Sequence, residues 1–228
     1  MLRQNLKQAM VTEINPFSPV SESFRALRTH LQFVNQDEPL RVITAASAAS
    51  GEGKTTTLVN LAIAYAQEGK RVVLIDGDMR RPNLHHVFAE SNHVGLSNCL
   101  RDKLEATEVM RSTAIGGLFL IPSGPIPHNP AELLASRQMR ELVEQLKGKA
   151  DVVLIDGPPV LAVTDSKLIA SYCDGVVLVV HTSKSKRELV KKAKEQLEAV
   201  KARVLGVVLN GQKHQANKSV YQYERAAK

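Results

Sequence analysis

A loop of small residues that ends in a lysine and a threonine follows the short apolar run 41–45. It reads Ala-Ala-Ser-Gly-Glu-Gly-Lys-Thr from Ala48 to Thr55, and a helical pattern begins where it ends. This is the phosphate-loop pattern with its first glycine replaced by Ala48. Small residues let successive backbone N–H groups curl around an anion, and the N-terminus of the following helix adds positive potential. The loop therefore predicts a nucleotide site.

Two side chains of this loop have the chemistry to handle phosphate and metal. Lys54 can reach the β- and γ-phosphates of ATP, and the hydroxyl of Thr55 can bind Mg²⁺. The alternative is a glycine-containing turn with a coincidental lysine, which the strand before the loop and the helix after it disfavour. The nucleotide-binding residues expected here are Ser50, Gly51, Glu52, Gly53, Lys54, Thr55 and Thr56.

Two further apolar runs end in acids. Asp76 and Asp78 follow one run, and Asp156 follows another. A carboxylate at the end of an apolar strand is costly to bury unless it is paired or near a metal. We expect Asp156 to support Mg²⁺ through its waters, and either Asp76 or Asp78 to accept a proton from an attacking hydroxyl or to orient a water. The alternative, that these acids only cap turns, has most weight for Asp78.

Apolar strand patterns alternate with amphipathic helical patterns along the chain. This alternation predicts an α/β fold, a doubly wound and mostly parallel sheet flanked by helices. Ligands of such sheets bind beyond the carboxyl ends of the strands, where the loop and the acids lie. The predicted strands are Arg41–Ala45, Arg71–Ile75, Leu118–Ile121, Asp151–Ile155, Gly175–Val180 and Arg203–Leu209, and helices are expected over Thr55–Gln67, Ala131–Leu146 and residues 185–200.

Composition limits the class of protein. The chain of 228 residues, 43% hydrophobic, suits one large domain, and it contains neither a run long enough to span a membrane nor a signal-peptide pattern. Two isolated cysteines favour a cytoplasmic protein over a disulfide framework. Residues 184–228 hold 12 Lys and Arg against 4 Asp and Glu, but residues 184–218 lack the aromatics of a nucleic-acid platform, so no nucleic-acid partner is expected.

Taken together and in order, the motifs resemble those of the bacterial tyrosine kinases of the capsule and exopolysaccharide family, which share the P-loop fold of the MinD/ParA-type ATPases. The resemblance extends from about Ser21 to the end of the chain. It rests on the helix triplet Glu22, Arg25 and Arg28, the loop Ala48–Thr55, and the segments Leu74–Pro82, Ser123–Leu133, Ile155–Pro159 and Val208–Asn210, followed by tail tyrosines.

This resemblance implies a stand-alone kinase that transfers the γ-phosphoryl group of ATP to tyrosine. Lys54 and Thr55 would hold ATP–Mg²⁺, and Thr55, Asp76 and Asp156 would form the metal site. One of Asp76 and Asp78 would activate the tyrosine hydroxyl, whose ordinary pKa is near ~10. Asn210 would lie near the adenine.

The resemblance also implies how the molecules assemble. Glu22, Arg25 and Arg28 would mediate subunit contacts in a ring, in which the tail of one subunit enters the active site of its neighbour. Without the resemblance, the same triplet describes a solvated helix with ion pairs three residues apart. The tail has only two tyrosines, Tyr221 and Tyr223, where relatives carry a dense run. We expect an extension over residues 1–20, a kinase domain over 21–211 and a tyrosine-bearing tail over 212–228.

Further partners follow from the resemblance. They are a membrane adaptor that recruits the cytoplasmic kinase to the inner face of the membrane and a cognate phosphotyrosine phosphatase. The first alternative function is a MinD/ParA-type ATPase that acts in positioning, although that group carries a lysine where this chain has Ala49. The second is a nucleotide-gated scaffold without catalysis, which the intact set of lysine, threonine and acids disfavours.

Overall fold

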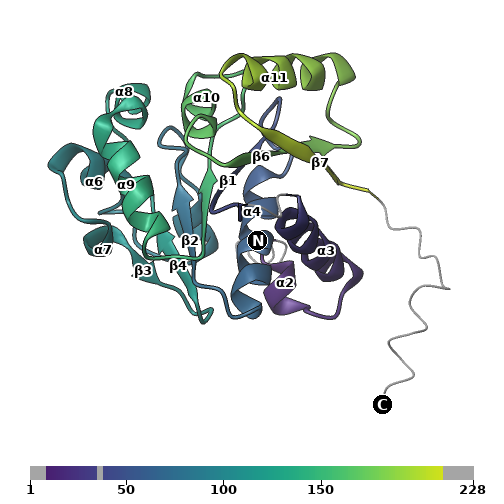
Figure 1. Cartoon of the computed structure of the whole chain (residues 1–228), viewed down its shortest axis with the longest axis horizontal. Helices are drawn as coiled ribbons and strands as arrows, with labels where there is room; N and C mark the ends of the chain where they lie inside the picture. Colours follow the sequence, from purple (N-terminus) through teal and green to yellow (C-terminus); the bar gives the residue numbers. More distant parts are fainter. Residues whose placement is uncertain (1–8, 35–37, 213–228) are drawn as a thin grey trace.

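A seven-stranded sheet forms the centre of the molecule (Figure 1). The computed structural model describes residues 9–34 and 38–212. The strand order is β3-β4-β2-β5-β1-β6-β7, and every neighbouring pair is parallel except β3 and β4. The strands are β1 Val42–Ala46, β2 Val72–Asp76, β3 Arg111–Ser112, β4 Leu118–Ile121, β5 Val152–Asp156, β6 Gly175–His181 and β7 Val204–Asn210.

The α/β class and the mostly parallel sheet predicted from the sequence are confirmed. All six predicted strands exist, with ends displaced by one residue at most. Five strands end one residue later than predicted, and in three of them the last residue is a predicted site residue, namely Asp76, Asp156 or Asn210. The short antiparallel strand β3 was not predicted, because two residues carry no periodicity.

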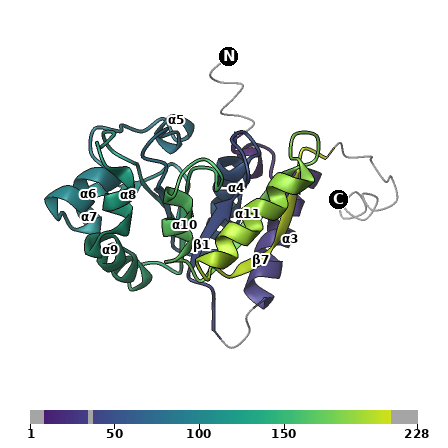
Figure 2. The ribbon, with the colours of Figure 1, turned by 90° about the horizontal axis from the view of Figure 1, so that it is seen from above.

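Helices cover both faces of the sheet. Ile43 and Leu74 face a cluster with Leu61 of the helix after the loop, whereas Ile155 faces the opposite cluster. Figure 2 shows α6 to α9 on one side of β1 and α3 on the other. The helices are α2 Val11–Ile14, α3 Pro19–Phe33, α4 Lys54–Gln67, α5 Leu84–Val87, α6 Leu96–Asp102, α7 Ala106–Val109, α8 Pro130–Ala135, α9 Arg137–Lys147, α10 Asp165–Ala170 and α11 Arg187–Ala199.

The single helix predicted over Ala131–Leu146 is wrong, because two helices, α8 and α9, meet at Ser136. The backbone of Ser136 is extended (φ −68°, ψ 161°), and its hydroxyl accepts a hydrogen bond from the N–H of Met139. The same hydroxyl donates to the carbonyl of Leu133 at 2.6 Å. Serine therefore ends one helix and caps the next, a role for which its short polar side chain is suited.

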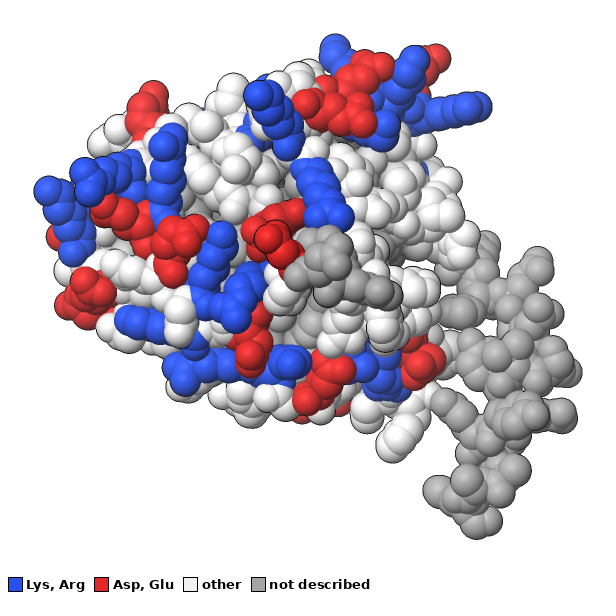
Figure 3. Space-filling view, in the orientation of Figure 1, with Lys and Arg blue, Asp and Glu red and all other residues white. Residues whose placement is uncertain are grey.

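The basic helix α11 carries its own counter-charges. Lys191 pairs with Glu195 and Lys194 with Glu198, each four residues apart. Figure 3 shows basic and acidic side chains interspersed over this face of the molecule, including the part that α11 covers. The lysines of α11 thus belong to a solvated helix face. Among the helices that the structure describes, none is both long and apolar enough to cross a membrane.

Candidate active site

The strand order brings the loop and the predicted acids together. Strands β2, β5 and β1 are neighbours, and Asp76 lies opposite Asp156 in the register of β2 and β5. The loop that follows β1 leads into α4. Because the strands are parallel, all three carboxyl ends open on the same edge of the sheet. Residues about 100 positions apart in the chain therefore form one site.

The loop has the backbone of an anion cradle. Gly51 and Gly53 adopt positive φ angles of 76° and 103°. Gly53 is the residue before the first turn of α4, and no side chain caps this helix end. The first N–H groups of α4 thus have no intrahelical partner, which is the arrangement that binds phosphate. A Cβ on Gly53 would lie 1.9 Å from Nδ2 of Asn210, so only glycine fits there.

Lys54 lies buried beneath this cradle. Its Nζ donates to the hydroxyl of Ser47 at 3.1 Å. Burial lowers the pKa of Lys54, and the neighbouring acids Asp156 and Asp78 act in the opposite direction. A single neutral hydroxyl is a weak partner for a buried ammonium, and it leaves N–H donors of Lys54 that a phosphate oxygen can accept.

Glu52 and Asn210 brace the loop from behind. The Glu52 carboxylate, which is buried, accepts hydrogen bonds from the N–H of Ala49 and the hydroxyl of Ser185. The Asn210 amide donates to the carbonyl of Glu52 at 3.0 Å and accepts from the N–H of Gly211 at 2.8 Å. These contacts tie the loop to the ends of β6 and β7. They also show that Glu52 contributes structural support through its side chain.

Thr55 and the two strand-end acids face one another. The Thr55 hydroxyl donates to Asp156 Oδ2 at 2.6 Å. Asp76 Oδ2 accepts from the N–H groups of Asn83 and Leu84, both at 2.9 Å. The second oxygen of each acid, Asp76 Oδ1 and Asp156 Oδ1, is buried without a hydrogen-bond partner. Such orphaned acceptors in a buried site indicate a missing cation.

The ionisation of the acids reflects this arrangement. Burial, followed by the nearby Asp156 carboxylate, raises the pKa of Asp76 to about 7. Burial likewise raises the pKa of Asp156 to about 6, against the hydrogen bond from Thr55. Both shifts arise because the apolar strand ends disfavour charge in the absence of a cation.

Asp78 has a different environment from Asp76. It is half-buried, and its Oδ1 accepts a hydrogen bond from the N–H of Arg81 at 3.0 Å. Burial raises its pKa, while the N–H of Arg81 and the charge of Lys54 lower it. The positive charge of Lys54 therefore acts on the Asp78 carboxylate, which is still partly exposed to solvent.

The residues present fit a magnesium ion that also binds phosphate oxygens. The threonine hydroxyl and two unpartnered carboxylate oxygens are hard oxygen ligands, as Mg²⁺ prefers. In the described part of the chain no group of three or more His, Cys, Asp or Glu side chains could hold a metal alone. This agrees with a cation held by few protein ligands, with water and phosphate completing its shell.

Comparison with known proteins identifies the family. The model of the AAA domain matches residues 40–208. The tyrosine-protein kinase YwqD of Bacillus subtilis (strain 168) is 39% identical over 216 residues, which cover 93% of this chain and 91% of the relative. The chain belongs to the bacterial tyrosine-protein kinases. The motifs in the sequence predicted this family, and the prediction is confirmed.

Solved structures agree with this assignment. The chimerical protein CapA2B2 superimposes with a TM-score of 0.87 at 40% identity, covering 90% of this chain and 91% of that one. The kinase domain of the Escherichia coli tyrosine kinase ETK has a TM-score of 0.87 at 33% identity, with 91% and 81% covered. The cell division ATPase MinD of Pyrococcus furiosus is more distant, with a TM-score of 0.65 at 27% identity and 74% and 71% covered. The kinase is thus closer to tyrosine kinases than to the MinD type.

The kinase has a hollow beside the loop. It has a volume of about 760 Å³ and lies between α3 and β7, next to α4. Apolar side chains line one part of it and polar groups the other, with Asn210 and Thr182 at the end near the loop. The lining includes Val20, Phe24, Leu27, Thr57, Thr182, Val208, Leu209 and Asn210.

The predicted site residues separate into three groups. Ser50 to Thr56, Asp76, Asp78, Asp156 and Asn210 meet at the edge of the sheet described above. Glu22, Arg25 and Arg28 lie elsewhere, on α3. Tyr221 and Tyr223 lie outside the described residues. Pattern reading missed the contributions of Ser47 and Ser185, because single serines in loops carry no distinctive spacing.

Proposed function

We propose that this kinase phosphorylates its own tail tyrosines, Tyr221 and Tyr223, in trans, and also other proteins, in the control of capsule or exopolysaccharide production. The observation that carries the proposal is the meeting of Lys54 and Thr55 with two buried acids whose second oxygens have no partner. This arrangement suits ATP–Mg²⁺ and a transfer that depends on positioning and charge neutralisation.

The residues of the site divide into those that bind phosphate and those that would hold the metal ion. The N–H groups at the start of α4 and the Lys54 ammonium bind the phosphates of ATP. Thr55, Asp76 and Asp156 would hold Mg²⁺, and the bound ion would supply positive charge beside the phosphates. The orphaned oxygens of the two acids would find their partner in that cation.

Asp78 is the better candidate for the residue that accepts the proton of the attacking tyrosine. Both oxygens of Asp76 are accounted for, one by two backbone N–H groups and the other by the proposed cation. Asp78 is half-buried, so an incoming hydroxyl can reach it. A carboxylate placed within hydrogen-bond reach of the tyrosine hydroxyl would take its proton as the bond to phosphorus forms.

The hollow between α3 and β7 fits the adenosine part of ATP. Its polar end adjoins the loop through Asn210 and Thr182, and its apolar part offers Val208 and Leu209 to a planar base. The Asn210 amide is already hydrogen-bonded to the backbone, so its orientation is fixed. We expect it to lie beside the adenine in this fixed orientation.

Assembly is part of the proposal. We infer a ring in which Glu22, Arg25 and Arg28 contact the neighbouring subunit, and a membrane adaptor whose cytoplasmic tail recruits and activates the kinase. A cognate phosphatase would remove the phosphate. Phosphate added to the tail would loosen the ring by charge repulsion. Similarity to the chimerical protein CapA2B2 supports the adaptor and the oligomer, whereas the phosphatase is proposed from the family resemblance alone.

The test is phosphorylation of the purified chain by ATP–Mg²⁺, with and without an adaptor tail fused to its N-terminus. Phosphorylated residues are mapped by mass spectrometry, and Lys54→Met serves as the matched control. We expect phosphate on Tyr221 or Tyr223, and its loss in the control. Removing Lys54 should reduce transfer by at least about 100-fold, because the lysine stabilises charge in the transition state.

ATP turnover without phosphotyrosine, even with the adaptor tail attached, would contradict the proposal for the tail. Phosphorylation of an added tyrosine polymer in the absence of tail phosphorylation would separate the kinase reaction from the proposed autophosphorylation.

A further inference from the structure

An ion pair between a partly exposed arginine and a buried aspartate lies beside the turn that follows β2, outside the residues of the proposed ATP–Mg²⁺ site. Asp165, the first residue of α10, has a side chain with no exposed surface. Arg80 donates to both of its oxygens, from Nε at 2.8 Å and from a terminal nitrogen at 3.1 Å. The Arg80 side chain is 42% exposed, so the pair connects a surface cation to a buried anion.

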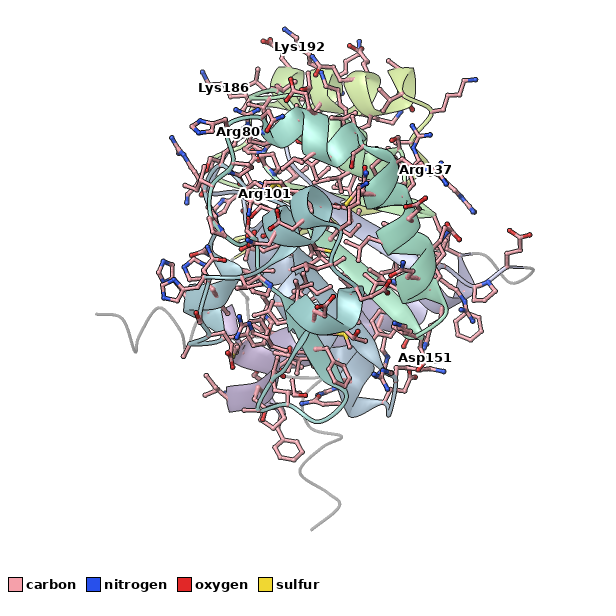
Figure 4. All side chains as sticks on the ribbon, turned by 90° about the vertical axis from the view of Figure 1, so that its left-hand side faces the viewer. Arg80, Arg101, Arg137, Asp151, Lys186 and Lys192 are labelled. Atoms are coloured by element: carbon pink, nitrogen blue, oxygen red, sulfur yellow. The ribbon has the colours of Figure 1, made fainter. Side chains whose placement is uncertain are left out.

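The pair joins the two segments that follow the acid-bearing strands. Arg80 comes two residues after Asp78, beyond β2, and Asp165 comes nine residues after Asp156, beyond β5. Figure 4 shows Arg80 and Asp151 at opposite ends of the molecule, as expected for residues that follow and precede neighbouring parallel strands. Arg80 therefore lies on the edge of the sheet that carries the site.

A second contact holds these segments together closer to the sheet. The N–H of Gly77 donates to the carbonyl of Asp156 at 2.8 Å. A Cβ on Gly77 would lie 2.7 Å from that carbonyl oxygen, so the two chains approach as closely as glycine permits. The ion pair is the outer of the two connections, and Asp78 lies between them in the sequence.

Asp78 depends on the turn that Arg80 anchors. The N–H of Arg81 donates to the Asp78 carboxylate, so the backbone that follows Arg80 sets where this carboxylate lies. A two-pronged arginine–carboxylate contact fixes both distance and orientation, which a single contact does not. Anchoring the Arg80 side chain to α10 therefore restrains the turn from residue 78 to residue 81.

We propose that Asp165 is a positioning residue for phosphoryl transfer, which acts through Arg80 to hold Asp78 in place. The inference rests on the proposed role of Asp78 as proton acceptor. The ion pair contributes geometry more than net stability, because the desolvation of a buried carboxylate offsets much of its attraction. Displacing a catalytic group by about 1 Å can cost about 100-fold in rate.

The test is a double-mutant cycle with Asp165→Asn, Arg80→Ala and both together, assayed by transfer to an added tyrosine peptide. Each single variant should lower kcat by about 10- to 100-fold, with KM for ATP within about twofold of wild type, because the phosphate loop is untouched. The double variant should be no slower than the slower single variant, since Asp165 acts only through Arg80. Arg80→Lys should remain impaired, because an ammonium cannot make the paired contact.

Control variants distinguish a loss of positioning from a general loss of folding. Arg101→Ala removes another two-pronged pair, Arg101 with Asp102, which is exposed and has no hydrogen bond to a residue of the site among the described residues, and should leave kcat unchanged. Arg80→Ala changes a partly exposed residue, so it tests the inference even if Asp165→Asn fails to fold. Each variant's thermal unfolding is measured alongside.

The outcomes are distinct. Wild-type kcat in Arg80→Ala, or single losses that multiply in the double variant, would overturn the positioning role. Loss of activity in Asp78→Asn together with full activity in Asp165→Asn would overturn the inference alone. Full activity in Asp78→Asn would overturn the proposed proton acceptor, and the inference with it.

Discussion

Asp76 has one carboxylate oxygen that accepts two backbone N–H groups and one that accepts none. The first holds the residue in place and the second has no partner, while Asp156 lies opposite Asp76 in the register of β2 and β5. Two carboxylates so close in an apolar setting favour a shared proton or a cation. The two carboxylates would therefore favour binding of a divalent ion, and without that ion their closeness destabilises the ionised, folded protein.

The raised pKa of Asp76 predicts how stability depends on pH in the protein without Mg²⁺ and nucleotide. Its pKa is about 7 when folded and about 3.9 when unfolded. Between these values the folded state holds more protons, so the free energy of unfolding falls as pH rises from about 4 to about 7. The slope approaches about 1 kcal/mol per pH unit. Thermal unfolding measured across this range checks the sign.

Asp76→Asn removes one of the two acids with a raised pKa and should reduce this dependence, leaving the part that Asp156 contributes below about pH 6. Adding Mg²⁺ with ATP should flatten it as well, because the cation favours the ionised form. A wild-type protein whose unfolding temperature rises between pH 5 and pH 7, in the absence of ligand, would contradict the assignment.

Among the elements, the loop before α4 decides whether a phosphate can bind. Its course depends on Gly53, which has a positive φ and leaves room for the Asn210 amide. The brace by Glu52 and Asn210 then fixes the cradle against β7. A local turn pattern and a contact across more than 150 residues are therefore both needed to form it.

Gly53→Ala should weaken ATP binding by at least about tenfold, because a Cβ would displace the Asn210 amide and strain the backbone. Gly69→Ala is the matched control. Gly69 also has a positive φ, of 86°, but a Cβ there meets nothing within 4 Å. Gly69→Ala should lower stability by about 1 kcal/mol and leave ATP affinity unchanged. Titration calorimetry with ATP–Mg²⁺ measures both, and equal affinities in the two variants would contradict the role of Gly53.

For the whole molecule, the helix triplet on α3 raises the question of assembly. Arg25 pairs with Glu22 at 2.8 Å and donates to the carbonyl of Pro16 at 2.6 Å. Arg28 donates to the carbonyl of Ala64 on α4 at 2.9 Å. The residues of the triplet therefore differ in exposure: the Glu22 side chain is largely exposed, whereas the Arg28 side chain is mostly covered by its own subunit.

Glu22→Ala should shift the protein from ring to monomer with little change in thermal stability, because its side chain is 59% exposed. Arg28→Ala should affect both, since its guanidinium also anchors α3 to α4. We expect the unfolding temperature of Arg28→Ala to fall by several degrees, for a loss of about 1 to 2 kcal/mol. Sedimentation velocity and thermal unfolding check these outcomes, and an unchanged oligomer in Glu22→Ala would argue against the proposed ring contact.

Local sequence patterns predicted six of the strands, the phosphate loop and the acids at the strand ends. The β-branched runs, the glycines of the loop and the acids at strand ends are local patterns, and each depends on residues within a few positions. The order of strands could not be read from them, but the common edge could, because parallel strands share it. Hence Lys54, Asp76 and Asp156 were placed together correctly.

Only the tertiary structure decided which side chains support that site. The partners of Arg80, Glu52 and Asn210 lie on other elements, up to 158 residues away in sequence. A buried Asp165 and an exposed aspartate look the same in a sequence, because burial depends on how helices pack on the sheet. The break at Ser136 has the same origin, since the helical sequence pattern continues through it while its backbone is extended.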